Sequence, residues 1–406
     1  MCLQQFFRAP GNNQNRDVRL TVNKIKHALY AISASILAST CYAESKLNLP
    51  RGVTPVSEDI YNLHMTALIV AALIGLTVFG LIGYCVIFFR QSKNPVPAKF
   101  DGNLKIEIIW TIIPFLILIG LAIPATKILS NIHDTSESEI AIKVIGHQWK
   151  WSYEYLDNDI KFYSYMTTPI DEIEGKVKPS QSYLLNVDND LVVPVNTKIK
   201  LLVTSDDVIH SWWVPALGVK QDGIPGFINE NWFYAKKTGT YRGHCGELCG
   251  IYHAFMPIVV KVVSKKDYAK WVVNKKREIK RLAAESTRNM SFKDLMKLGK
   301  HEYDRNCVMC HRSDGSGIAY TYPALKGSRV VTGTLNEAII YVLRGVPNAA
   351  MQAFGEILDN REFAAVITYV RNSWGNENII KTENFQLAAK ASDVQLMRQR
   401  LKGKME

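Results

Sequence analysis

The sequence has little of several features that would assign it to a simple class. It has no internal repeat and no low-complexity segment, and its 47% hydrophobic and 21% charged residues exclude a disordered chain. Its mean hydropathy is only −0.04, which excludes a protein made mostly of membrane spans. Seven cysteines in 406 residues are an odd number, which argues against a pure disulfide framework. The length indicates two or three domains.

Positive charge is in excess, with 49 Lys and Arg against 37 Asp and Glu and a net charge of +12. Such a balance suits anionic lipid or nucleic acid as a partner. Much of the excess, however, lies at the two ends of the chain and in one linker. We therefore expect membrane lipid and no nucleic acid among the partners.

Residues 1–43 are predicted to be a signal peptide. A basic stretch precedes the small and apolar run Ala28–Thr40, and Ala43 supplies a small residue at the cleavage position. Thirteen residues are too few for a membrane span, which needs about 20. A lipoprotein cleaved before Cys41 stays open as an alternative, as does a start codon further in.

Residues 44–130 are predicted to form a transmembrane hairpin. The runs 63–89 and 108–125 contain no Asp, Glu, Lys or Arg and are long enough to span a bilayer. The short loop between them carries Arg90, Lys93, Lys99 and Lys105 against Asp101 and Glu107. Because such basic loops stay cytoplasmic, everything after residue 130 is expected in the periplasm.

Three further parts follow the hairpin. Residues 131–264 contain short β-rich runs separated by turn residues, which predicts a β-sandwich or barrel. Residues 265–290 are predicted to be a charged and solvated linker, and residues 291–375 have the pattern of a helical domain. Residues 376–406 are predicted to be a polar basic tail with a surface helix near its end.

One cluster of side chains has the chemistry of a copper site. Cys245, Cys249, His253 and Met256 lie within twelve residues, and His210 follows a strand-like run upstream. Thiolate, imidazole and thioether together favour copper, and two cysteines could bridge a pair of metals. A disulfide between the cysteines would explain neither His253 nor Met256. Structural zinc would leave Met256 unused, and a blue-copper site uses one cysteine.

A second cluster has the spacing of a covalent haem site. Cys307, Cys310 and His311 form the Cys-x-x-Cys-His signal, in which two thiols bond to the haem and the histidine binds its iron. A thioredoxin-like redox pair would not need the histidine. With these two sites, four cysteines have roles, and the rest lie in the leader (Cys2, Cys41) and the first span (Cys85).

A six-coordinate haem needs a second axial ligand, and Met351 is the candidate. It lies in the loop Gly345–Gly355, whereas Met296 and Met309 have helical neighbours and are expected to pack in the core. Ligation by His and Met raises the haem potential, which suits an electron travelling towards oxygen.

Several motifs resemble the family of cytochrome c oxidase subunit II, over about residues 50–265. They are IEIIWTIIP at 106–114, GHQWKWSYEY at 146–155 and DDVIHSW at 206–212. The segment 291–375, with its closing YVRNSWGN, is similar to the class I cytochrome c domain fused to some bacterial subunits II. The resemblance implies a multidomain chain, with a transmembrane hairpin, a cupredoxin-like domain and an all-α cytochrome c domain.

The resemblance also implies roles for particular residues. The side-chain ligands of a dinuclear copper centre, CuA, would be His210, Cys245, Cys249, His253 and Met256. The Glu247 carbonyl would complete this centre, and its carboxylate would reach a Mg²⁺ ion shared with subunit I. Trp149 matches the residue at which electrons enter, and Glu107 matches the carboxylate at the mouth of a proton channel.

Two positions depart from the family pattern near these motifs. Phe227 stands where an arginine is usual, beside the segment 222–226 that faces subunit I in the family. His244 replaces a common glutamine, so its role is open.

The function implied is that of subunit II of a respiratory haem–copper oxidase in the bacterial inner membrane. Electrons would pass from a cytochrome c donor through haem c and CuA to subunit I, where oxygen is reduced to water with proton pumping. Subunits I and III would be partners. One alternative is the CuA relay subunit of a nitric oxide or nitrous oxide reductase, which the paired spans, Glu107 and Glu247 do not favour. A copper-storage protein would have no use for a haem, and a quinol oxidase subunit lacks the copper ligands.

Overall fold

The structure is a computed structural model that describes residues 48–96, 99, 102–347 and 349–402. The predicted signal peptide, with its alternative cleavage site at Cys41, lies outside the described residues.

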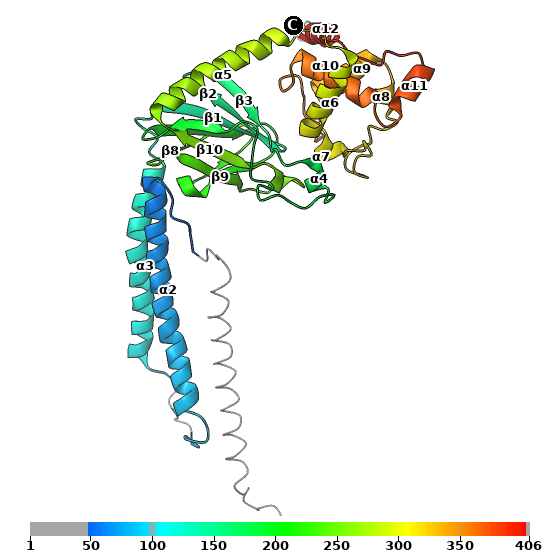
Figure 1. Cartoon of the computed structure of the whole chain (residues 1–406). Helices are drawn as coiled ribbons and strands as arrows, with labels where there is room; N and C mark the ends of the chain where they lie inside the picture. The colour runs from blue at the N-terminus through cyan, green and yellow to red at the C-terminus, as the bar shows by residue number, and fades with distance from the viewer. Residues whose placement is uncertain (1–47, 97–98, 100–101, 348, 403–406) are drawn as a thin grey trace, which may run out of the picture. The chain divides into compact units, whose positions relative to one another are not determined.

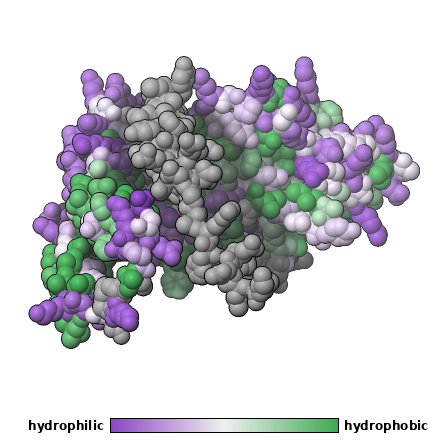
Figure 2. All heavy atoms as spheres, turned by 90° about the horizontal axis from the view of Figure 1, so that it is seen from below, coloured by the Kyte–Doolittle hydropathy of each residue, from purple (hydrophilic) through white to green (hydrophobic). Residues whose placement is uncertain are grey.

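Two long helices follow, α2 (Pro55–Phe88) and α3 (Leu104–Ile132), and they lie side by side (Figure 1). Each contains an 18-residue window with a mean hydropathy of 2.5, so both are long and apolar enough to cross a membrane. Their large hydrophobic side chains are exposed. Figure 2, which views the molecule from below, shows green hydrophobic areas between purple hydrophilic ones. Side-chain caps at Thr54 and Asn103 begin the helices, which extend beyond the predicted apolar runs.

The next part is a sandwich of two five-stranded sheets, as the sequence predicts. In sheet order, the first sheet contains β3 (Ile160–Ser164), β2 (Lys150–Tyr155), β1 (Ile140–His147), β5 (Lys198–Ser205) and β8 (Asn229–Tyr234). The second contains β4 (Leu191–Pro194), β10 (Ile258–Val263), β9 (Gly239–Cys245), β6 (His210–Val214) and β7 (Val219–Gly223). Alternate residues face the core, where Trp151, Trp212 and Phe233 are fully buried. Short helical turns connect the strands at α4 (Ile170–Ile173), η1 (Pro215–Leu217) and η2 (His253–Phe255).

Helix α5 (Lys265–Glu285) differs from the solvated linker predicted for residues 265–290. Trp271, Val272 and Ile279 form an apolar stripe that packs against the core of the sandwich. The Trp271 ring lies 5.1 Å from that of Tyr155, between ring centroids. Most of the charged residues lie away from the core, although Lys275 is buried beside the stripe, and α5 belongs to the packed structure.

The C-terminal part is helical, with α6 (Phe292–Asn306), α7 (Val308–His311), α8 (Arg329–Thr332), α9 (Leu335–Arg344) and α10 (Asn360–Arg371). Helices α6 and α10 pack closely, and Tyr303 and Phe363 are fully buried in the core. This all-α arrangement confirms the predicted fold class.

The last helices, α11 (Asn376–Thr382) and α12 (Ala391–Lys402), also join this core. Val394 and Met397 are buried among the residues of α9 and α10. The sequence predicted a polar basic tail after residue 375 with a surface helix near its end, whereas α12 packs into the core. Two apolar residues three positions apart on a short helix are a weak signal in a basic segment, which explains the difference.

Candidate functional site

The five predicted side-chain copper ligands come from two neighbouring strands and one loop. His210 begins β6 and Cys245 ends β9, and these strands pair beside each other. The chain then turns back through Cys249 and His253, and Met256 precedes β10. The pairing of β6 with β9 therefore brings residues 35 positions apart in sequence to one end of the sandwich.

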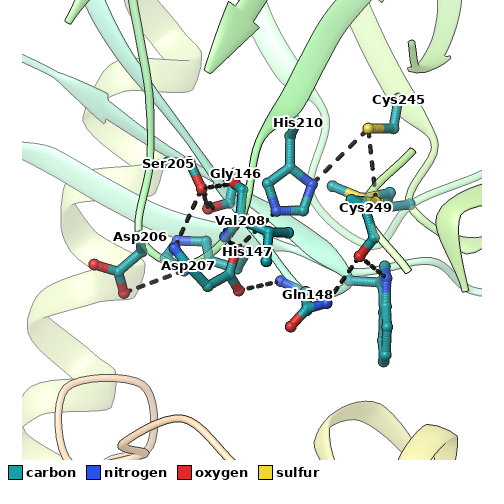
Figure 3. A network of polar contacts seen from close by, with 12 residues as sticks. Gly146, His147, Gln148, Ser205, Asp206, Asp207, Val208, His210, Cys245 and Cys249 are labelled. Carbon is teal, nitrogen blue, oxygen red and sulfur yellow. Dashed lines mark hydrogen bonds and ion pairs between the residues drawn. The ribbon is translucent and has the colours of Figure 1, made fainter. Parts of the chain in front are cut away.

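The structure brings these side chains together around the two sulfur atoms. Cys245 Sγ lies 3.9 Å from His210 Nδ1 and 3.9 Å from Cys249 Sγ (Figure 3). Cys249 Sγ lies 3.5 Å from His253 Nδ1 and 3.6 Å from Met256 Sδ. The Glu247 carbonyl oxygen lies 3.3 Å from Cys245 Sγ, while the Glu247 residue itself is exposed.

This donor set fits a pair of copper ions. Both cysteines are free thiols in the structure, with their sulfurs 3.9 Å apart rather than at the bonding distance of about 2.05 Å. A metal ion can bond to both sulfurs, because 3.9 Å is less than twice a metal–sulfur bond of about 2.3 Å. One histidine nitrogen lies on each side of the sulfur pair, so two metals would each have an imidazole.

The electrostatics of the cluster favour one thiolate before metal binds. Cys245 is buried, but a hydrogen bond from the Cys249 thiol, with help from His210 and the backbone, lowers the pKa of Cys245. Burial disfavours the charged form of His210, yet the Asp207 carboxylate and Cys245 outweigh it and raise the pKa of His210. Thiolate is the form that binds metal.

Asp207 is a site residue that sequence reasoning missed, although it lies inside the DDVIHSW motif. Its Oδ1 accepts a hydrogen bond from His210 Nε2 at 2.8 Å, and its Oδ2 accepts one from the Gln148 backbone N–H at 2.7 Å (Figure 3). Gln148 Nε2 and Trp149 Nε1 donate to the Cys249 carbonyl at 2.8 and 3.2 Å. This network links His210 to the residue predicted to receive electrons. The spacing of three residues between Asp207 and His210 was the available signal.

Gly146 leaves room for His210. A Cβ atom at this position would lie 2.7 Å from His210 Cδ2, closer than atoms in contact can approach. The end of β1 can therefore pass beside the imidazole only because residue 146 has no side chain.

The predicted haem residues line one cavity of about 300 Å³ in the helical part. Cys307, Cys310, His311 and Met351 all border it, and most of the remaining lining is apolar. Burial raises the pKa of Cys307 to about 12 and that of Cys310 to about 11. Neutral thiols are therefore expected here at neutral pH.

His311 has the orientation that an axial ligand requires. Its Nδ1 donates a hydrogen bond to the Pro323 carbonyl at 2.9 Å, which leaves the Nε2 lone pair free to bind a metal. Burial lowers the pKa of His311, which also favours the neutral ring. The donor set and the cavity fit a haem attached to the Cys-x-x-Cys-His segment.

Trp149 and Gln148 also border this cavity, within the compact unit Arg51–Glu406. In the same unit Arg305 of α6 pairs with Asp188 at 2.5 Å. Glu107, in contrast, lies in the first turn of α3, where it accepts a hydrogen bond from the Asn103 backbone at 3.3 Å. The predicted site residues thus form two clusters, with Glu107 in a separate element.

Three family models match the chain. "Cytochrome C oxidase subunit II, periplasmic domain" matches residues 140–263, and "Cytochrome C oxidase subunit II, transmembrane domain" matches residues 43–128. "Cytochrome C oxidase, cbb3-type, subunit III" matches residues 294–370.

Several relatives are similar over part of the chain. A probable cytochrome c oxidase subunit 2 of Rickettsia bellii is 43% identical, over 62% of this chain and 94% of the relative. Cytochrome c oxidase subunit 2 of Cereibacter sphaeroides is 40% identical, over 59% of this chain and 88% of the relative. Among solved structures, the periplasmic domain of subunit II of cytochrome oxidase from Bradyrhizobium japonicum is 47% identical. That match covers 36% of this chain and 98% of that one, with a TM-score of 0.32.

Proposed function

The chain belongs to the family of cytochrome c oxidase subunit II, and from that premise we propose how its own residues serve electron transfer. It would take electrons from a cytochrome c donor into its C-terminal domain and pass them through the sandwich domain to subunit I. Reduction of oxygen to water and proton pumping would belong to that partner. The family models imply copper in the sandwich and haem in the C-terminal domain.

The observation that carries the proposal is the pair of sulfurs, Cys245 and Cys249, between the imidazoles of His210 and His253. These four side chains would hold the two copper ions of CuA, with Met256 and the Glu247 carbonyl completing the site. His210, Cys245, Cys249 and Met256 are at least 97% buried, so the protein excludes water from these four ligands, while His253 is partly exposed. A rigid and dry site changes little when its charge changes, which favours fast electron transfer.

The haem would be held by the second cluster. Cys307 and Cys310 would form the covalent bonds, while His311 and Met351 would be the axial ligands. The Pro323 carbonyl fixes the His311 ring, and the apolar walls keep water from the metal. Copper and haem, when bound, would supply the one-electron chemistry that ordinary side chains lack.

Trp149 is proposed as the residue through which electrons enter the sandwich domain. Its indole borders the haem cavity and donates a hydrogen bond to the carbonyl of the ligand residue Cys249. One side chain therefore lines the haem cavity and bonds to a copper-ligand residue. This contact supports the role that the resemblance implies.

The remaining roles are proposals that rest on family resemblance. The exposed Glu247 carboxylate is available for a Mg²⁺ ion shared with subunit I, and Glu107 would begin a proton path. Phe227 and Leu248 are 67% and 77% exposed, so they offer apolar surface to a partner such as subunit I. The basic loop between α2 and α3 supports a periplasmic location for the sandwich and the haem domain. Subunit III and membrane lipid complete the proposed partners.

Purification of the intact complex tests the proposal. We expect two copper ions and one covalently bound haem per copy of this chain, together with oxygen uptake in the presence of reduced cytochrome c. Electron paramagnetic resonance should show one unpaired electron shared by two coppers. A four-line spectrum of a single copper, or a Cys245→Ser variant that keeps the shared signal, would contradict the proposed centre.

A further inference from the structure

The C-terminal segment after α10 has no part in the proposed function, yet it is built into the haem domain. The match to the cytochrome family model ends at residue 370, so α11 and α12 lie beyond it. Helix α12 packs on both α9 and α10. These are the helices that precede and follow the loop carrying Met351.

One side chain of α12 reaches into the connection between those helices. The Arg398 guanidinium donates to the carbonyls of Gly355 and Leu358, the latter at 2.7 Å. Its Nε donates to Asn360 Oδ1, also at 2.7 Å, at the start of α10. A planar guanidinium can hold three acceptors at once in a fixed geometry, which a lysine cannot do. Arg398 therefore fixes the turn 354–358 against α10.

This turn forms the C-terminal anchor of the Met351 loop. Phe354 and Leu358 are buried in the core beside Val394 and Met397 of α12. The Phe354 N–H donates to the Val342 carbonyl at 3.0 Å, which closes the loop back onto α9. Phe354 also borders the haem cavity together with Met351.

The N-terminal anchor is a tight turn at Gly345, where φ is +65°. A Cβ atom at residue 345 would lie 2.5 Å from the Met351 carbonyl oxygen, so only glycine permits the close passage. The Val346 N–H donates to that same carbonyl at 2.9 Å. The loop is thus held by its own backbone at one end and by Arg398 and α12 at the other.

We propose that Arg398 is a positioning residue that presents Met351 to the haem iron, and that α12 exists in this domain to carry it. The inference rests on the proposed function, since it takes Met351 as the axial ligand. The described residues of this loop, 345–347 and 349–355, contain no helix or strand, so holding Met351 in place has an entropic cost. Hydrogen bonds from a charged donor to the adjoining turn reduce the number of conformations that compete with the ligating one.

The test uses the full chain with its haem attached and compares two arginines of the same helix. Arg398→Met removes the three hydrogen bonds but keeps an apolar stem, whereas Arg400→Met removes an exposed arginine. One readout is the weak sulfur-to-iron absorption band of the oxidised haem, followed as the pH is raised until Met351 is displaced. The other is amide hydrogen exchange at Val346 and Phe354, whose N–H groups close the loop.

In Arg398→Met we expect the rate of amide hydrogen exchange at Val346 and Phe354 to rise roughly tenfold or more, because the loss of even one hydrogen bond to a charged group changes an equilibrium by that factor. The pH at which half of the sulfur band is lost should fall by about one unit for the same reason. Arg400→Met should match the wild-type chain in both readouts. Arg398→Lys should lie between the wild-type chain and Arg398→Met in both readouts, since an ammonium group reaches fewer acceptors.

Three outcomes would overturn the proposal. They are no change in Arg398→Met, an equal change in Arg400→Met, or exchange that rises equally in α6 and α10, which would indicate a general loss of stability. Met351→Ala separates this failure from that of the proposed function. If that variant keeps the sulfur band, Met351 is not the ligand. Exchange at Val346 and Phe354 would still show whether Arg398 holds the loop.

Discussion

Asp207 Oδ1 accepts a hydrogen bond from His210 Nε2 at 2.8 Å, and this fixes which nitrogen of the imidazole faces the sulfur pair. In the neutral ring that binds metal, Nε2 carries the proton, so Nδ1 presents its lone pair towards Cys245, 3.9 Å away. The same carboxylate accepts the Gln148 N–H, so the ring and the 148–149 segment are held by one residue. The orientation of a metal ligand is thus set by a residue that does not bind the metal.

The first prediction concerns this carboxylate. Asp207→Ala should weaken copper binding by about 10–100-fold, the usual effect of losing a hydrogen-bond partner of a metal-bound histidine. Asp207→Asn should lose less copper affinity than Asp207→Ala, because its amide oxygen can still accept the hydrogen bond from His210 Nε2–H. Competition with a copper chelator measures both.

Asp206→Ala is the matched control for losing one negative charge. The Asp206 side chain is 70% exposed and faces His147 rather than His210. Equal losses of copper affinity in the two alanine variants would mean that the general charge of the loop, and not the bond to His210, is what matters.

The second prediction concerns the space beside His210. Gly146→Ala should displace the imidazole, since the added methyl group would lie 2.7 Å from Cδ2. The unfolding free energy should fall by about 1–3 kcal/mol, as for other overpacked positions, and the shared-electron copper signal should be lost. Thermal unfolding and paramagnetic resonance of the same sample check this.

Gly246→Ala serves as the control in the same site. A Cβ atom there would first meet the flexible end of Lys220, at 3.1 Å, which can move. If both variants lose the copper signal alike, contact with His210 is not the cause.

The sequence yields candidate copper and haem residues because most of them lie close together along the chain. Cys245 to Met256 span twelve residues, and Cys307 to His311 span five, so residue type and spacing already define the chemistry. The two-sheet fold was predictable in kind, since short strands separated by turns allow few architectures.

Contacts between distant residues could not be predicted in this way. Arg398 reaches Gly355 across 43 positions, and Gln148 reaches Cys249 across 101. The packing of α5 and α12 depends on apolar stripes of only two or three residues among many charges. Such stripes become informative only when the surface that they cover is known.

The third prediction concerns pH and His147, which is 97% buried. Burial lowers the pKa of His147, and the Asp206 carboxylate, 3.5 Å away, offsets this only in part. The unfolded chain therefore binds this proton more readily than the folded chain does. Stability from this group is present above pH 6.5 and is lost as the pH falls below that value.

His147→Gln should reduce this acid sensitivity. The substitution should reduce the slope of the unfolding free energy against pH by at most about 1.4 kcal/mol per pH unit, the value for a single proton. Denaturant unfolding of the apo protein at pH 5.0–7.5 measures it, with His133→Gln as the control for losing an exposed imidazole. An unchanged profile in His147→Gln would assign the acid sensitivity to other groups.

The last prediction concerns Trp149, whose Nε1 donates to the Cys249 carbonyl at 3.2 Å. Trp149→Phe keeps an aromatic ring at this position but removes the N–H, so the hydrogen bond to the copper-ligand residue is lost. We expect the copper content and its spectrum to stay the same, because Trp149 is not itself a ligand. Reduction of the copper centre by a soluble cytochrome c should become slower, since the hydrogen bond that joins the residue at the haem cavity to Cys249 has been removed. Stopped-flow absorbance of the loaded protein measures this rate.

Trp213→Phe is the matched control, because Trp213 is also an indole near the cluster. Its ring contacts His244, with 4.7 Å between ring centroids, and not the Cys249 carbonyl. A rate that falls equally in both variants would mean that electrons do not depend on the Trp149 connection. A loss of copper in Trp149→Phe alone would instead make Trp149 a structural support of the site.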